Sequence, residues 1–290
     1  MELKHTESIP EPFRSAILDD RYEKGIDVTA SATTIIKPVR VTKLRKAHFK
    51  DIEESAVRRV SAMLGTAVHN ILEEYGEGLG WHVERRLYGV SKSGLSYSGQ
   101  LDALIPNGDE TWTIGDYKVV PTFKHNQLDE YFDQLNIQAA LARQAGYKVT
   151  ALKVVAVFKD WMESRTKTLA DDDKYPPLPI MEYDVPMREA DELDEWIDQR
   201  LRMIVGNELP LCSPEERWMR DPKWAVYKPK GKRATKVFDK EVDAEMFNVT
   251  ELKSQGRIEH RPALPVRCVN NYCGVADWCD QWQEEKHLWK

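Results

Sequence analysis

Residues 99–105 read GQLDALI and, after a turn, residues 114–120 read IGDYKVV. Each stretch places one carboxylate, Asp102 or Asp116, inside an otherwise apolar run. Burying an isolated carboxylate is costly, so a strand with Asp at a core position needs a partner for that charge. Side chains alternate along a strand, so Asp116 and Lys118 share a face, and a tight turn would bring Asp102 alongside. The two stretches predict neighbouring antiparallel strands that carry an acidic site.

The spacing of apolar residues outward from this pair predicts alternating helices and strands. Expected helices cover residues 51–75, 128–145 and 189–205, and expected strands cover residues 81–90, 95–105, 111–120, 149–158 and 181–185. Gly76 and Gly78 are expected to end the first helix, and Gly65 to let it pack closely on the sheet. This order favours an α/β fold with a mixed central sheet flanked by helices.

Changes in periodicity and composition along the chain predict three parts. Residues 1–30 lack periodicity and are expected to form a loosely held N-terminal arm, and residues 31–206 form the α/β core. Residues 207–290 form an extension with a basic hairpin at 224–238, a short helix at 240–252 and a cysteine-rich tail.

Composition excludes several classes of protein. The chain has 290 residues, 41% hydrophobic and 31% charged, which is typical of a globular protein. No apolar run approaches the roughly 20 residues of a membrane helix. The first residues, MELKHTES, are too charged for a secretory signal, so a cytoplasmic location without membrane contact is expected. The net charge of −6 disfavours nucleic acid, but residues 223–236 hold six basic side chains and no acid.

The acidic strand pair has the chemistry of a metal site. Two hard oxygen ligands suit Mg²⁺ or Mn²⁺, and Lys118 beside the ion would orient a water or neutralise a phosphate. An ordinary cross-strand ion pair is the alternative. His69, within the expected first helix, and Gln134, on the helix after the lysine strand, add candidate partners. Each of these alone is more often a core residue or a solvated one.

Taken in order, these residues resemble the RecB-like branch of the PD-(D/E)XK nuclease superfamily across residues 31–158. The matching motifs are GTAVH at 65–69, GQLD at 99–102, DYK at 116–118 and Gln134, with Glu84 as a candidate upstream acid. Residues 31–36, SATTII, with Arg40, are similar to the start of phage-encoded members. Many members place Tyr four residues after the helix Gln, where this chain has Gln138.

The resemblance implies a restriction-endonuclease-like core and a metal-dependent deoxyribonuclease. It implies that His69, Asp102, Asp116 and the Tyr117 carbonyl hold one or two Mg²⁺ or Mn²⁺ ions. Lys118 would position the attacking water, with Gln134 in a supporting catalytic role. It further implies an exonuclease acting on DNA ends in phage recombination or genome processing, with recombination proteins as partners, in the host-cell cytoplasm. The alternative is a catalytically silent DNA-binding or assembly module on the same fold.

The cysteines indicate a second metal site. All four follow residue 200: Cys212, Cys268, Cys273 and Cys279. Four thiolates suit a [4Fe–4S] cluster or structural Zn²⁺, and the lack of short C-x2-C knuckles favours iron–sulfur. Several RecB-like nucleases carry such a cluster with three C-terminal cysteines, which strengthens this expectation. Four buried thiols are the alternative.

The basic hairpin is the candidate DNA contact. Lys228, Lys230, Lys232 and Arg233 would bind phosphates, and the interleaved Trp224, Tyr227 and Phe238 would stack on bases of single-stranded or frayed duplex ends. Arg217 with Trp218 is a weaker candidate of the same kind. A solvated charged hairpin is the alternative.

Overall fold

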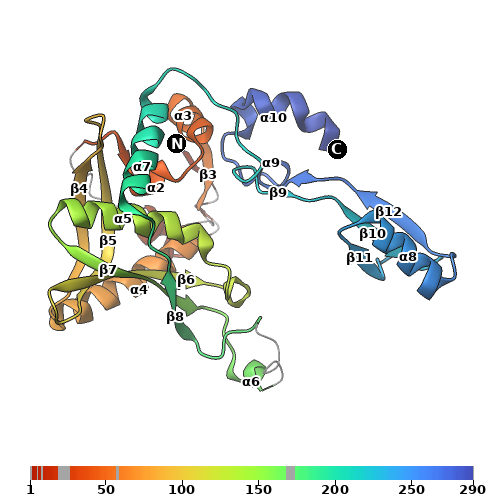
Figure 1. Cartoon of the computed structure of the whole chain (residues 1–290), viewed down its shortest axis with the longest axis horizontal. Coiled ribbons are helices and arrows are strands. Elements are labelled where there is room, and N and C mark those ends of the chain that lie inside the picture. The colour runs from red at the N-terminus through yellow and green to blue at the C-terminus, as the bar shows by residue number, and fades with distance from the viewer. Residues whose placement is uncertain are drawn as a thin grey trace. The chain divides into compact units, whose positions relative to one another are not determined.

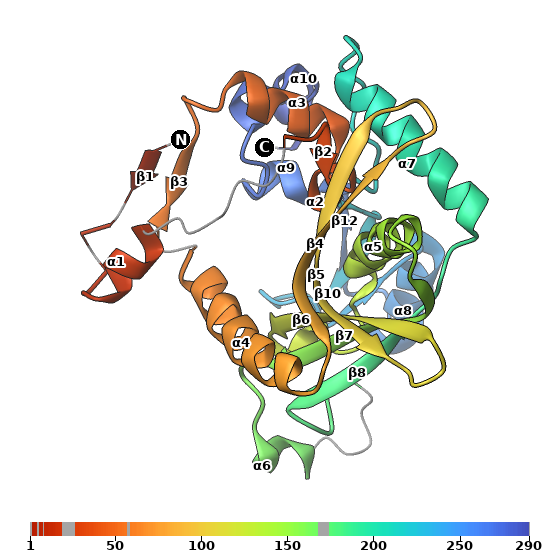
Figure 2. The ribbon, with the colours of Figure 1, turned by 90° about the vertical axis from the view of Figure 1, so that its left-hand side faces the viewer.

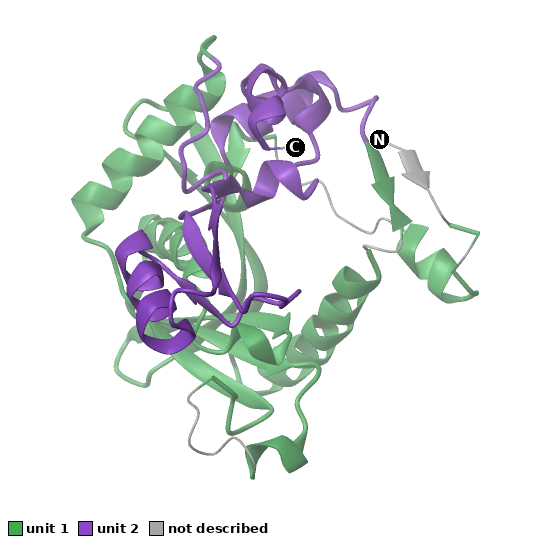
Figure 3. Cartoon of the chain, turned by 90° about the vertical axis from the view of Figure 1, so that its right-hand side faces the viewer, with its two compact units in different colours: residues 1–37, 53–208 green, residues 38–52, 209–290 purple. Residues whose placement is uncertain are grey.

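The computed structural model describes residues 2–4, 6–7, 9–18, 27–56, 59–167 and 174–289. The chain forms two compact units, coloured separately in Figure 3. Unit 1 comprises residues 1–37 and 53–208, and unit 2 comprises residues 38–52 and 209–290. The division near residue 208 lies close to the expected one at 206, but the segment 38–52 joins the cysteine-rich part in unit 2, which the sequence did not indicate.

Unit 1 is a mixed α/β structure (Figure 1). Its strands are β1 (Glu2–Lys4), β2 (Ala30–Ser31), β3 (Glu53–Ser55), β4 (His82–Val90), β5 (Ser96–Pro106), β6 (Thr111–Val120), β7 (Lys148–Phe158) and β8 (Ile180–Val185). Its helices are α1 (Phe13–Leu18), α2 (Ala32–Ile35), α4 (Arg59–Gly78), α5 (Phe132–Gln144), α6 (Glu163–Thr166) and α7 (Ala190–Val205). The central strands and α5 and α7 confirm the elements expected from residue spacing.

The central sheet is mixed, as expected. Its order is β2-β5-β6-β7-β8, and β4 also pairs with β5. The β4–β5, β5–β6 and β7–β8 pairs are antiparallel, whereas β6–β7 and β2–β5 are parallel. The parallel β6–β7 pair needs a crossover, which α5 supplies. This puts the N-terminal end of α5 just after the strand that carries Asp116 and Lys118.

Helices flank this sheet, with α4 and α5 on opposite sides of it in Figure 2. Residues 135–142 of α5 are all buried, because α5 lies between the sheet and α7. A Cβ built on Gly76 would meet Val83 Cγ1 at 2.7 Å, whereas one on Gly65 would meet no atom within 4 Å. The close approach of α4 to the sheet therefore occurs at Gly76, and the role expected for Gly65 was wrong.

The N-terminal third of unit 1 differs from its sequence expectation in two places. Residues 53–55 form β3, and α4 starts only at Arg59, so the helix is shorter than the predicted 51–75 at its start. The segment expected to be a loose arm includes β1, which pairs with β3, and α1. Ile9 and Ile17 are buried with Ala56 and pack near the start of α4. These apolar positions are too few to show a period in the sequence.

Unit 2 combines short helices with a small sheet. Its elements are α3 (Val39–Ala47), β9 (Met219–Arg220), β10 (Lys223–Tyr227), β11 (Lys236–Phe238), α8 (Glu241–Leu252), β12 (Arg257–Arg261), β13 (Leu264–Pro265), α9 (Val266–Val269) and α10 (Asp280–Glu285). Strands β11, β10 and β12 form an antiparallel sheet on which α8 packs. The hairpin and the helix were both expected. Among the described residues, no helix is long and apolar enough to cross a membrane.

Candidate metal centre and cysteine pocket

The acidic site lies where β5 and β6 stop pairing. Their antiparallel ladder runs from Pro106–Trp112 to Ala103–Gly115. One residue further along each strand stand Asp102 and Asp116. There the Asp102 carboxylate takes the place of a ladder partner: its Oδ2 accepts the Tyr117 N–H at 2.8 Å. This hydrogen bond fixes Asp102 and leaves the Tyr117 carbonyl free to face the site.

His69 reaches this fork from α4, as the sequence predicted. Its Nε2 donates to the Tyr117 carbonyl at 3.1 Å and lies 3.7 Å from Asp102 Oδ2. Its Nδ1 donates to Glu84 Oε1 at 3.0 Å. The hydrogen bond to Glu84 is the largest of the effects that raise the pKa of His69, and the negative charge of Asp102 adds to it. As placed, the ring is held at both nitrogens in a fixed orientation.

Glu84 is the site residue whose role the sequence left undefined. It lies opposite Asp102 in β4, at a break in the β4–β5 ladder between Val83–Ala103 and Arg85–Leu101. Its backbone has φ +45°, a left-handed conformation that costs a non-glycine residue about 1–3 kcal/mol. With this backbone conformation the Glu84 carboxylate reaches His69, and Gln100 Nε2 donates to its second oxygen at 2.6 Å. Such strain in mid-strand is typical of functional sites.

Asp116 is fully buried between Lys118 and α5. Lys118 Nζ lies 2.5 Å from Asp116 Oδ2, and Gln134 Nε2 donates to Asp116 Oδ1 at 3.0 Å. Lys118 Nζ also lies 5.1 Å from the centre of the Tyr131 ring, a cation–π distance. Gln134 and Lys118 thus contact the two oxygens of the same carboxylate.

The acids of the site repel one another. Burial and, after it, the negative charge of Asp116 together raise the pKa of Asp102 to about 6. Burial also raises the pKa of Asp116, against the opposing charge of Lys118. For Glu84, burial raises the pKa, but hydrogen bonds from His69 and Gln100 outweigh it and hold the pKa below its usual value. The cluster therefore combines three acids, Glu84, Asp102 and Asp116, with two basic side chains, His69 and Lys118.

The donor set fits a hard divalent cation. One ligand atom each from His69, Glu84 and Asp102 lies within 4.8 Å of the others. Neighbouring ligands of an octahedral Mg²⁺ with bonds of 2.0–2.1 Å stand about 3 Å apart. The 3.1 Å between His69 Nε2 and the Tyr117 carbonyl matches that spacing, and the 3.7 Å to Asp102 Oδ2 is close to it. A cation there would replace the proton on Nε2 and relieve the repulsion between the acids.

Gln138 holds β5, the strand that carries Asp102. It is 1% exposed and donates from Nε2 to the Gln100 carbonyl at 2.8 Å, two residues before Asp102. Gln138, which stands where the resemblance predicts Tyr, is therefore a core residue that holds β5 in place. Gln100 in turn accepts from Arg86 Nη2 at 2.7 Å. A chain of contacts therefore runs from Arg86 through Gln100 and Glu84 to His69.

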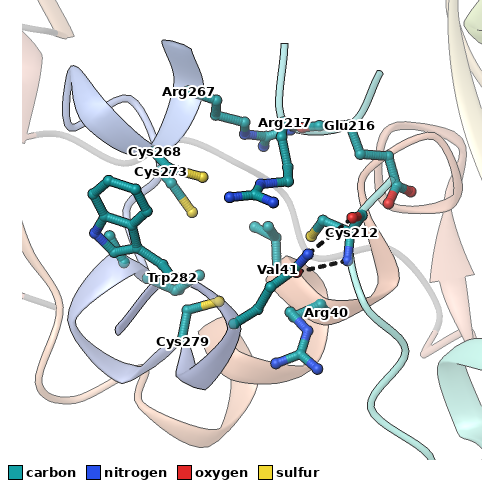
Figure 4. Close-up of a pocket in the computed structure, with 13 residues that line it drawn as sticks. Arg40, Val41, Cys212, Glu216, Arg217, Arg267, Cys268, Cys273, Cys279 and Trp282 are labelled. Carbon is teal, nitrogen blue, oxygen red and sulfur yellow. Dashed lines mark hydrogen bonds between the residues drawn. The ribbon is translucent and has the colours of Figure 1, made fainter. Parts of the chain in front are cut away.

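All four cysteines line one pocket within unit 2 (Figure 4). They come from three places: Cys212 follows α7, Cys268 lies on α9, and Cys273 and Cys279 follow it. Gln281 clamps the backbone of Cys212, accepting its N–H at 2.8 Å and donating to its carbonyl at 3.1 Å. Cys212 stands far from the others in sequence, and the structure brings it to the same pocket.

The pocket has arginines around its thiols. Arg40 of α3, 3% exposed, pairs with Asp280 and donates to the carbonyls of Leu209 and Pro210, both at 2.8 Å. Burial raises the pKa of Cys212 to about 12, with the Glu216 charge adding to it. Without a metal ion these conditions keep the Cys212 thiol protonated, and a bound metal would ionise it. The pocket role of Arg40 was missed because it depends on contacts across most of the chain.

The basic residues of the hairpin lie on the loop 228–235 between β10 and β11. Lys228, Lys230, Lys232 and Arg233 are all exposed there. The aromatic residues do not accompany them. Tyr227 is 6% exposed, with its hydroxyl on Glu259 at 3.1 Å, and Phe238 packs on Phe247.

The expectation that these aromatic side chains stack on bases was therefore wrong for Tyr227, because its ring is buried and lies under the Arg257 guanidinium group at 4.2 Å. Trp224 is half-buried and packs against His260, with 5.1 Å between ring centres. Arg217, the weaker candidate, is buried in the cysteine pocket, whereas Trp218 beside it is 50% exposed. A phosphate-binding role for the loop remains a prediction.

Comparison with known proteins does not indicate a function for this chain. No protein-family model and no curated protein matches the chain. A solved chain described as "Crystal structure of SSO0001" shares 17% sequence identity with a TM-score of 0.49, over 71% of this chain and 87% of that one. The function is therefore inferred from the geometry of the two sites and from the motif order.

Proposed function

We propose that the chain is a Mg²⁺- or Mn²⁺-dependent DNA nuclease of the RecB-like, PD-(D/E)XK type. The observation that carries the proposal is the convergence of the expected residues from four elements. His69 of α4, Asp102 of β5, Asp116 and Lys118 of β6, and Gln134 of α5 meet at one fork of the sheet. Glu84 completes the set from a strained position. An ordinary cross-strand ion pair would not require six side chains from five elements.

The chemistry follows from the donors. A divalent cation bound there supplies charge neutralisation on the scissile phosphate and a water with a lowered pKa. His69, Glu84, Asp102, Asp116 and the Tyr117 carbonyl are the residues that would hold it. Lys118, whose Nζ lies beside Asp116, would orient the attacking water or neutralise a phosphate oxygen. Gln134 keeps Asp116 in place, and Glu84 keeps His69 in place.

Two further parts of the proposal rest on unit 2. Cys212, Cys268, Cys273 and Cys279 would hold a [4Fe–4S] cluster, with Zn²⁺ as the alternative metal. Lys228, Lys230, Lys232 and Arg233 would contact the phosphates of DNA ends. Arg217, whose guanidinium group points into the cysteine pocket in Figure 4, is a suitable counter-charge for bound thiolates.

A substrate panel tests the proposal. Linear duplex, linear single strands and closed circular DNA are incubated with the protein in Mg²⁺, Mn²⁺ or EDTA. We expect the linear forms to be degraded with either metal, no cleavage in EDTA, and intact circles, which is the pattern of an exonuclease. Nicked circles would overturn action from ends. Tight binding without cleavage of any substrate would overturn the nuclease and favour the silent DNA-binding module.

A further inference from the structure

Arg217 is the charged side chain most deeply placed among the thiols. It is 7% exposed, and in Figure 4 its guanidinium group points into the pocket between Cys212 and the pair Cys268 and Cys273. A buried arginine remains charged, and Glu285, whose Oε2 lies 2.6 Å from Arg217 Nη2, supplies one balancing charge. Metal-bound thiolates in the pocket would place further hydrogen-bond acceptors beside the guanidinium group.

The hydrogen bonds of Arg217 leave part of its donor capacity unused. Its Nη2 donates to Glu285 Oε2 of α10 at 2.6 Å, which fixes the guanidinium plane. Burial raises the pKa of the Cys268 thiol, and a hydrogen bond from Arg217 partly offsets that rise. Among the described residues, the buried Nε atom of Arg217 has no hydrogen-bond partner. Buried donors seldom remain unpaired in a folded protein.

Arg267 lines the same pocket as Arg217 and has a similar set of contacts. Its Nη1 donates to the Glu216 carbonyl at 3.1 Å and its guanidinium lies 5.2 Å from the centre of the Trp218 ring. Its Nε is also buried and, in the part of the chain that the structure describes, without a partner. Two unpaired guanidinium donors at one pocket of thiols indicate that the pocket is completed by a group that accepts hydrogen bonds at sulfur.

We propose that Arg217, clamped by Glu285, is a positioning residue that donates to the sulfur atoms of the cofactor in the cysteine pocket. Its charge and hydrogen bonds slow the loss of that cofactor and, for an iron–sulfur cluster, raise its reduction potential. This inference rests on the proposed cysteine-bound metal but not on the nuclease. Hydrogen bonds to cluster sulfurs stabilise the reduced, more negative state, and groups around the ligands commonly change metal affinity by about 10–100-fold.

The test compares Arg217→Gln and Arg217→Lys with the wild type, with Arg220→Gln as the matched control on an exposed arginine of the same unit. The full-length proteins are purified without oxygen, and iron, acid-labile sulfide and zinc are measured. Release of the bound metal to a chelator is then followed with time. We expect release about 10–100-fold faster in Arg217→Gln, an intermediate rate in Arg217→Lys, and the wild-type rate in Arg220→Gln.

Reduction with dithionite through mediators gives the second readout when iron is bound. One electron enters the cluster, and the potential of Arg217→Gln should be more negative than that of the wild type. Should Arg217→Gln not fold, Glu285→Gln keeps Arg217 but loosens its clamp and should release metal faster than the wild type. Wild-type release rates in both Arg217→Lys and Glu285→Gln would overturn the proposal, as would a wild type that binds no metal. DNA cleavage plays no part in either measurement.

Discussion

The two candidate sites differ in the charge of the side chains that they bury. In unit 1, Glu84, Asp102 and Asp116 crowd into a partly buried space with His69 and Lys118, and burial raises the pKa of Asp102 to about 6. In unit 2, neutral thiols surround arginines whose buried Nε atoms lack partners among the described residues. The first site gathers acids, whereas the second gathers arginines that keep, within the described residues, unpaired Nε donors although Arg40 and Arg217 are ion-paired with Asp280 and Glu285.

This difference indicates what each site would bind. A hard divalent cation balances the carboxylates, and it would need no change in the ladder around them. A metal bound by four thiolates carries net negative charge and balances the arginines. The same buried-charge principle therefore predicts two different metals in the two units.

The largest expected effect concerns Lys118. Lys118→Met removes the cation beside Asp116, so cleavage of linear DNA should fall about 10²–10⁴-fold, the range for losing a group that transfers or orients a proton. Binding of Mn²⁺ should persist, because the oxygen ligands remain. Lys153→Met, which removes a lysine of β7 that pairs with Glu182, is the matched control and should cleave normally. Activity of the Lys118 variant equal to that of its control would exclude a catalytic lysine.

The next effect concerns the fourth cysteine. Cys212→Ser should lower the bound metal to roughly a tenth or less of the wild-type level, as Cys273→Ser should, because a four-thiolate site with one ligand removed binds metal weakly. Ser213→Ala, at the adjacent residue, should keep its metal. Elemental analysis of anaerobically purified protein measures all three. A Cys212 variant with full metal content would show that the site uses only the C-terminal cysteines.

A smaller effect is expected at Glu84. Glu84→Gln should raise the Mg²⁺ concentration for half-maximal cleavage by about 10–100-fold, because it weakens the hold on His69 and removes one carboxylate. The activity at saturating metal should change less. Titration of cleavage against Mg²⁺ makes the comparison, with Glu74→Gln on the exposed face of α4 as the control. Identical metal curves for the two variants would make Glu84 a structural residue.

The smallest effect concerns a buried acid that already has its cation, because Arg202 Nε lies 2.9 Å from Asp198 Oδ2. Asp198 of α7 accepts hydrogen bonds from Ser91 and Ser93, which are the main reason that its pKa is lowered to about 2. A lowered pKa in the folded state stabilises the protein above the unfolded-state value and loses that effect as pH falls toward about 2. Asp198→Asn should therefore lower the Tm at pH 7, and the difference should shrink below about pH 4.

Thermal unfolding of wild type and Asp198→Asn across that range measures this difference. A gap in Tm that stays constant down to pH 2 would contradict the assignment. Asp116 differs from Asp198, because burial raises the pKa of Asp116 against the opposing charge of Lys118.

Much of unit 1 could be predicted from the sequence because its signals are local. The alternation in residues 111–120 and the apolar run in 149–158 defined β6 and β7 closely. The order of His69, Asp102, Asp116, Lys118 and Gln134 anticipated one site, and the structure brings these side chains together.

The rest depends on contacts between distant residues. The left-handed backbone of Glu84 stands where β4 pairs with β5, and a lone Glu in a strand carries no signal for it. Arg40 contacts Asp280 across 240 positions, and no local pattern links them. Tyr227 was expected to contact DNA bases because it stands next to lysines, but it is buried at the end of β10 together with Ala225 and Val226.

Cleavage by Asp116→Asn tests the central claim most directly. The substitution keeps the shape of the side chain and removes the charge that holds the cation, so the variant should fold with a Tm at least equal to that of the metal-free wild type. Mg²⁺-dependent degradation of linear duplex DNA should fall at least about 10³-fold. The exposed Asp133→Asn on α5 should cleave at the wild-type rate. A folded Asp116→Asn protein that degrades DNA as fast as Asp133→Asn would contradict the account.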